Sequence, residues 1–146
     1  MIPIHNAKAI LSEWITTYMK NRDIHQKRLK SINQNDETIV FTYIDKIQEV
    51  IIEPDLRHSS TLFAILENAG NNIYIVTMNT IANLNFLIEN WEKFIVFHHL
   101  ALCFVNPDSK EEKRWIVFPH THNSISIRNS LAKGLNSMFE TVECVN

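Results

Sequence analysis

The chain has 146 residues, of which 45% are hydrophobic and 21% are charged, and its formal net charge is −2. These values exclude a wholly disordered chain, because they match those of a protein with a packed core. They also exclude a protein that grips nucleic acid with its whole surface, while a local basic patch stays compatible with them. No apolar run approaches the ~20 residues of a membrane span and no leader-like segment opens the chain, so we expect one cytoplasmic domain over residues 1–146.

Glycine is scarce, since Gly70 and Gly134 are the only two in the chain. Loops that cradle phosphate need several residues without a Cβ, so that the backbone can approach the anion. The sequence therefore excludes a P-loop and a glycine-rich dinucleotide fingerprint. The two cysteines, Cys103 and Cys144, predict free thiols in a reducing compartment, because small domains held by disulfides usually carry more cysteines.

The first third of the chain begins with a helix that has one apolar face, and Asn6 is predicted to cap its first turn. Residues 20–30 are crowded with lysine and arginine, and we expect them to continue this helix or to form a second, mostly solvated one. Residues 38–44 and 47–53 are rich in β-branched side chains. They predict a hairpin that turns at residues 45–46, with a single bent strand as the alternative. The apolar face of the first helix consists of Ala7, Ile10, Leu11, Trp14, Ile15, Tyr18 and Met19.

The remainder of the chain alternates between apolar strands and amphipathic helices. Pro54 ends the second strand, since it has no amide to donate, and Gly70 is predicted to give the next helix a left-handed C-terminal cap. The elements predicted after Pro54 are a helix at 62–69, a strand at 73–78, a helix at 81–95, strands at 100–105 and 114–119, and a closing helix at 127–142.

This alternation predicts an α/β fold, a three-layer α-β-α sandwich with a mixed, mostly parallel sheet of about five strands. Right-handed crossovers place the strands at 47–53, 73–78 and 100–105 parallel to one another, with those at 38–44 and 114–119 antiparallel beside them. We expect the crossover helices to fall on one face of the sheet, and the first and last helices to cover the other.

Histidines flank the two strands of the predicted C-terminal hairpin. His98 and His99 precede one strand, and His120 and His122 follow the other. An antiparallel hairpin brings these ends together, and alternation along an extended chain puts His120 and His122 on one face, as shared metal ligands require. We therefore name His99, His120 and His122 as a candidate metal site, with solvated or backbone-bound histidines as the alternative.

Polar residues gather at the opposite edge of the sheet, at the carboxyl ends of the parallel strands, where open α/β sheets usually bind ligands. The candidate ligand-binding residues there are Asp55, Asn79, Thr80 and Asp108. The helix after Asn79 adds N-terminal amides suited to a small anion. Helix capping and turn formation are the competing roles for these side chains.

No catalytic motif organises these residues, so the expected function is that of a small intracellular binding or interaction module without chemistry of its own. Its partner is expected to be another protein or a second copy of the chain, with Trp14 or Tyr18 as anchors. One alternative is a metal-dependent hydrolase or nuclease. A second is nucleic-acid binding through the basic residues 20–30, against which the lack of interleaved aromatic side chains counts. The sequence identifies no cofactor and leaves enzymatic activity open.

Overall fold

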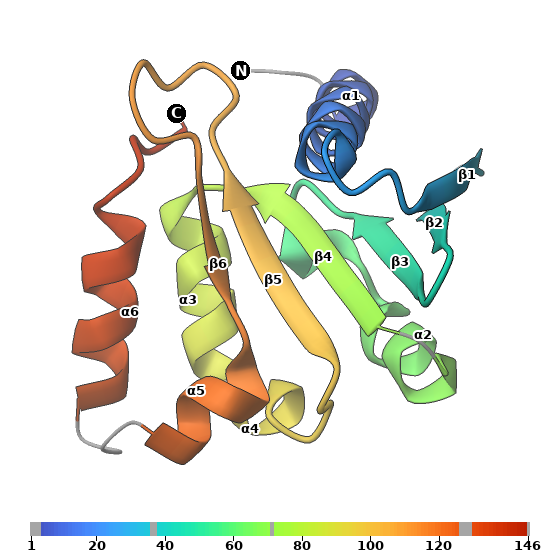
Figure 1. The fold of residues 1–146 in the computed structure, drawn as a ribbon. Helices are drawn as coiled ribbons and strands as arrows, with labels where there is room; N and C mark the ends of the chain where they lie inside the picture. Colours follow the sequence, from blue (N-terminus) through green and yellow to red (C-terminus); the bar gives the residue numbers. More distant parts are fainter. Residues whose placement is uncertain (1–3, 36–37, 71, 126–129, 146) are drawn as a thin grey trace.

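The computed structural model describes residues 4–35, 38–70, 72–125 and 130–145, and in this part of the chain the fold is α/β with one mixed sheet (Figure 1). The described strands are β1 (Leu29–Gln34), β2 (Thr38–Tyr43), β3 (Ile47–Ile52), β4 (Asn72–Met78), β5 (Leu100–Val105) and β6 (Arg114–Val117). The described helices are α1 (Ile4–Asp23), the 3-10 turn η1 (Leu56–His58), α2 (Leu62–Asn68), α3 (Ile81–Glu89), α4 (Trp91–Phe94), α5 (Pro119–Ile125) and α6 (Leu131–Phe139). None of these helices is long and apolar enough to cross a membrane.

The six strands lie in the sheet in their chain order, from β1 at one edge to β6 at the other. Strands β3, β4 and β5 are parallel, and β2 and β6 run antiparallel to their neighbours, as predicted. Because β1 also pairs antiparallel with β2, three of the five described pairings are antiparallel, and the prediction of a mostly parallel sheet was wrong. The chain turns back between β2 and β3, where the Tyr43 amide donates to the Lys46 carbonyl at 2.9 Å. The predicted hairpin is therefore confirmed, and the alternative of a single bent strand is wrong.

The prediction for residues 20–30 was wrong in its second half, because the chain leaves α1 at Asp23 and forms a sixth strand. Strand β1 pairs with β2, and the register shifts between Leu29 and Ser31. This bulge adds one residue to β1, so Leu29 and Ile32 both pack toward α1 although they are three residues apart. The same spacing is that of a helix face, which explains the error.

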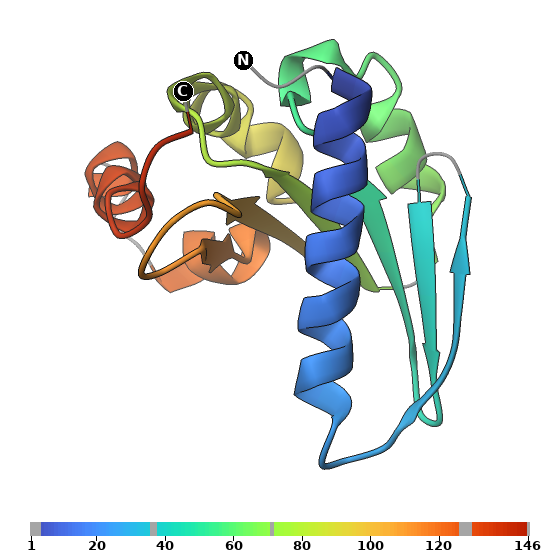
Figure 2. The same ribbon diagram turned by 90° about the horizontal axis from the view of Figure 1, so that it is seen from above.

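The two faces of the sheet are covered unequally. Of the described helices, α1 alone packs on one face, where Leu11, Ile15 and Met19 contact apolar side chains of β2 to β5. Figure 2 shows α1 lying across the strands. The other face carries α2, α3, α4 and also α6, whose Leu135 and Phe139 belong to its core. The last helix was expected on the α1 side, so this expectation was wrong.

The position of α6 follows from the width of the sheet. The crossover helices do not fully cover Phe104 of β5 and Trp115 of β6, which lie on the same face of the sheet as those helices. The rings of these two residues stack with centroids 4.2 Å apart. Helix α6 lies beside α3 and completes the cover over them. Burial of such large aromatic surfaces outweighs any preference for filling the α1 face, where Trp14 and Tyr18 stack on each other at 5.1 Å and are half-buried.

Smaller boundaries also differ from those predicted. The helix at 81–95 is divided at Asn90, which ends α3 and whose side-chain amide donates to the Phe86 carbonyl at 2.9 Å. Gly70 does not adopt a positive φ, so it makes no left-handed cap. Asn6 lies inside α1 rather than at its start. The start of the predicted closing helix at residue 127 falls outside the described residues, and α6 ends at Phe139.

Candidate functional site

The histidines predicted to bind metal lie near one another but use their rings differently. The rings of His98 and His120 stack with centroids 3.9 Å apart, and Nδ1 of His120 lies 2.9 Å from the Ile95 carbonyl oxygen. His122 meets the ring of Trp91 edge-on at 5.7 Å. His99 lies with His98 in the lining of a separate hollow between α2 and the start of β5. His120 therefore fits the alternative of a histidine whose ring contacts a backbone carbonyl.

The expectation that His120 and His122 share one face fails because they lie in a helix. Strand β6 ends at Val117, and Pro119 begins α5 at a position where its missing amide costs nothing. Residues two apart on a helix point in nearly opposite directions, whereas on a strand they point the same way. Among the described residues, no three His, Cys, Asp or Glu side chains lie together in a way that could hold a metal ion.

The residues predicted at the carboxyl edge do lie there, and the side chains of Asp55, Asn79 and Thr80 make contacts within the fold. Asp55 accepts hydrogen bonds from the Arg57 backbone amide at 3.1 Å and from its guanidinium at 2.8 Å. This guanidinium lowers the pKa of Asp55 below its ordinary value. Thr80 caps α3, since its hydroxyl accepts from the Asn83 amide at 3.2 Å. Asp108 is exposed in the loop between β5 and β6.

Asn79 is fully buried and ties residues 142–145, here named the C-terminal strap, to the end of the sheet. Its side-chain amide donates to the carbonyls of Val142 at 3.1 Å and Glu143 at 3.2 Å, and its side-chain oxygen accepts from the Trp115 indole at 2.7 Å. The Val145 amide donates to the Asn79 carbonyl at 2.9 Å. The chain thus occupies this part of the predicted ligand edge with its own backbone.

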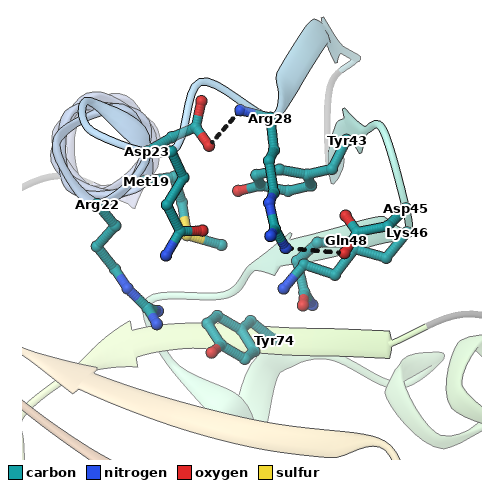
Figure 3. Close-up of a pocket in the computed structure, with 10 residues that line it drawn as sticks. Met19, Arg22, Asp23, Arg28, Tyr43, Asp45, Lys46, Gln48 and Tyr74 are labelled. Atoms are coloured by element: carbon teal, nitrogen blue, oxygen red, sulfur yellow. Dashed lines mark hydrogen bonds and ion pairs between the residues drawn. The ribbon is translucent and has the colours of Figure 1, made fainter.

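A pocket of about 250 Å³ lies at the other end of the sheet, beside the C-terminal end of α1 (Figure 3). Its walls come from α1, the start of β1, the β2–β3 hairpin and the start of β4. In Figure 3, Arg22 extends from α1 toward Tyr74, while Arg28 reaches toward Asp45. We call it the basic tyrosine pocket, and its lining is Met19, Arg22, Asp23, Gln26, Arg28, Tyr43, Asp45, Lys46, Gln48 and Tyr74.

The turn after α1 fixes the geometry of this pocket. Lys27 adopts a positive φ of 52°, which reverses the chain after the helix. The carboxylate of Asp23 then accepts from the backbone amides of Arg28 at 2.9 Å and Leu29 at 2.8 Å. Because these two bonds hold the start of β1 against the end of α1, the side chains of Arg22 and Arg28 face one space.

The charges in the pocket are only partly paired. Arg28 forms an ion pair with Asp45 at 3.3 Å, and the oxygens of Asp23 receive backbone amides. Arg22 instead points toward Tyr74, and its interaction with that hydroxyl raises the pKa of its guanidinium above the ordinary value. The ammonium of Lys46 lies 5.2 Å from the centre of the Tyr43 ring, a cation–π distance.

Tyrosine hydroxyls complete the lining. Burial, followed by the nearby charge of Asp23, raises the pKa of Tyr43, so its hydroxyl stays protonated and can donate a hydrogen bond. Gln48 is buried on the pocket wall, where its side-chain amide donates to the Glu49 carbonyl at 3.2 Å. The pocket therefore presents cationic and hydroxyl donors in one hollow.

Sequence reasoning did not find this pocket, although it noted the basic run that supplies Arg22 and Arg28. The aromatic side chains that seemed absent come from strands β2 and β4, later in the chain than the basic run. A scan against known protein families, a search of curated proteins and a search of solved structures each found nothing that matches this chain.

Proposed function

We propose that residues 1–146 form one three-layer α-β-α domain that acts as a binding module without chemistry of its own. Its ligand carries a small anionic group, a phosphate or sulfate, which binds in the basic tyrosine pocket. The observation that supports this most directly is the convergence of Arg22, Arg28 and Lys46 with two tyrosines in one hollow.

The balance of charge in the pocket favours an anion. Three basic side chains line it against two acidic ones, and both acids are already engaged, Asp45 by Arg28 and Asp23 by backbone amides. Arg22 and Lys46 are left facing tyrosine rings and hydroxyls. A guanidinium offers paired donors that match the oxygens of phosphate, so Arg22 supplies the geometry and Lys46 a second positive charge.

The size of the pocket favours a small group. At about 250 Å³ it lies below the roughly 300–1,000 Å³ that suits drug-sized ligands. The group is thus either a free anion or the charged end of a larger partner, such as a phosphorylated side chain of another protein. The exposed Lys27 and Lys30 beside the pocket add favourable charge for the approach of either one.

The test is a titration of ¹⁵N-labelled protein with inorganic phosphate, and then with a short phosphoserine peptide and its unphosphorylated counterpart. We expect saturable chemical-shift changes confined to the pocket, and loss of binding in the double variant Arg22→Gln and Lys46→Gln. Lys133→Gln on the exposed side of α6 is the matched control. Binding that survives the double variant, or no pocket response to any of the phosphate probes, would refute the proposal.

A further inference from the structure

A second pocket, of about 420 Å³, lies at the opposite end of α1, at the carboxyl end of β3. Open α/β sheets usually bind ligands outside the carboxyl ends of their parallel strands. The pocket combines an apolar floor with charged and hydroxyl side chains, a mixture typical of sites for small polar molecules. Its lining is Lys8, Ile51, Ile52, Glu53, His58, Ser59, Ser60, Thr61 and Ile65.

Opposite charges face this pocket without pairing. Glu53 follows β3 and Lys8 comes from α1; both side chains are half-buried, and no ion pair joins them within the described part of the chain. The neighbouring Asp55 differs, because Arg57 binds it at 2.8 Å and His58 lies 3.7 Å from it. The Glu53 carboxylate accepts a hydrogen bond from the Asp55 backbone amide at 3.4 Å, so the pocket is lined by a carboxylate and an ammonium that form no ion pair with each other.

A ligand with a single charge would not suit this arrangement. An anion that approached Lys8 would also face Glu53, and a cation drawn to Glu53 would also face Lys8. A small molecule that carries a positive and a negative group a few bonds apart can satisfy both side chains at once. The hydroxyls of Ser60 and Thr61 offer further donors, and the side chain of Thr61 is not used to cap α2.

We propose that this pocket binds a small zwitterion, the chemical class of the free α-amino acids. The ligand's ammonium donates to the Glu53 carboxylate, and its carboxylate accepts from the Lys8 ammonium and from the hydroxyls. The half-buried Ile65 leaves apolar surface for a short side chain. The Glu53 carboxylate is partly desolvated, and this burial raises its pKa above the ordinary value even though the Asp55 amide and Lys8 act in the opposite direction. A ligand ammonium would add a further favourable partner for it.

The experiment is a calorimetric or NMR titration with L-alanine, together with two analogues that each lack one charge. N-acetyl-L-alanine has no ammonium, and L-alaninamide has no carboxylate. We expect L-alanine to bind at least about tenfold more tightly than either analogue, because each removes one charge-assisted pair. Equal binding of all three compounds, or no binding of L-alanine, would overturn the proposal.

Variants assign the two charges to their side chains. Glu53→Gln and Lys8→Gln should each weaken alanine binding at least about tenfold, whereas Glu67→Gln on α2 and Lys20→Gln on α1 should leave it unchanged. Thermal unfolding of every variant checks that the fold is kept. Alanine binding that persists in both Glu53→Gln and Lys8→Gln refutes the site. The Arg22→Gln and Lys46→Gln double variant changes only the basic tyrosine pocket and should still bind alanine. The two proposals can therefore fail independently.

Discussion

Substitution of Asn83 by alanine tests whether the carboxyl end of the sheet is held by one buried amide. Asn83 is 1% exposed, and its side-chain oxygen accepts from the Leu56 amide at 2.9 Å. Its side-chain nitrogen lies 2.9 Å from the Pro54 carbonyl and 2.8 Å from the Met78 carbonyl. One side chain thereby joins α3 to η1 and to the ends of two strands.

The loss of unfolding free energy in Asn83→Ala depends on which of these backbone groups loses its only hydrogen-bond partner. The Pro54 carbonyl still accepts from the Thr77 hydroxyl at 3.1 Å, and the Met78 carbonyl still accepts from the Thr80 amide at 2.9 Å. Among the described residues the Leu56 amide has no other acceptor, and a buried unsatisfied donor costs about 1–3 kcal/mol. The small cavity adds to this cost and the better helix propensity of alanine offsets about half a kilocalorie, so we expect about 2–3 kcal/mol in total.

The assay is urea unfolding followed by tryptophan fluorescence, supported by thermal melts. A loss of about 2–3 kcal/mol lowers the Tm of a chain of this length by roughly 4–12 °C. Asn85→Ala is the matched control, since Asn85 lies exposed on the same helix and its replacement should change stability by less than about 0.5 kcal/mol. If Asn83→Ala differs from Asn85→Ala by less than about 1 kcal/mol, the reasoning about the buried amide is refuted.

Three further outcomes are expected. Trp91→Ala should lower the free energy of unfolding by about 3–5 kcal/mol in the same urea assay, because Trp91 is 4% exposed in the core; a change below about 1 kcal/mol would contradict this. Burial raises the pKa of Glu53, so the folded state disfavours its ionised form, and stability falls as the pH rises through the folded pKa. Glu53→Gln should therefore raise the Tm at pH 7. The gain should disappear in acid, because the Glu53 carboxyl is then protonated in both the folded and the unfolded state. A Tm gain that persists in acid would count against this explanation. Ellman's reagent should titrate one thiol per native chain, since Cys144 is exposed while burial raises the pKa of Cys103 to about 12; two rapidly reacting thiols would show that β5 is not buried.

Strand directions could be predicted from the sequence because they depend on local patterns. The apolar runs that became β3, β4 and β5 are separated by helix-length segments, and crossovers of that length join neighbouring strands in parallel. Their right-handedness then decides which face of the sheet the helices cover. The hairpin of β5 and β6 follows from two adjacent apolar runs joined by one long polar loop, residues 106–113, with no helix between them. Strand β1 could not be predicted, because its bulge gives Leu29 and Ile32 the spacing of a helix.

The candidate sites depend on contacts that local patterns do not encode. The conformation of the segment after β6 decides where His120 and His122 point, and Pro119 fits the first turn of a helix as well as the end of a strand. The basic tyrosine pocket needs the end of α1 to meet Tyr43 and Tyr74, which only the strand order of the folded sheet provides. The sequence therefore indicated the basic residues of this pocket but not the tyrosines that lie beside them.

The C-terminal strap has a consequence for the order in which the molecule can be made. Asn79 donates to Val142, which lies 63 residues further along the chain, and closing so large a loop is entropically costly. During synthesis on the ribosome the six described strands precede the strap, so the side-chain amide of Asn79 stays exposed to water until the strap docks. Its burial is completed only when residues 142–145 dock, which makes docking of the strap a late step of folding.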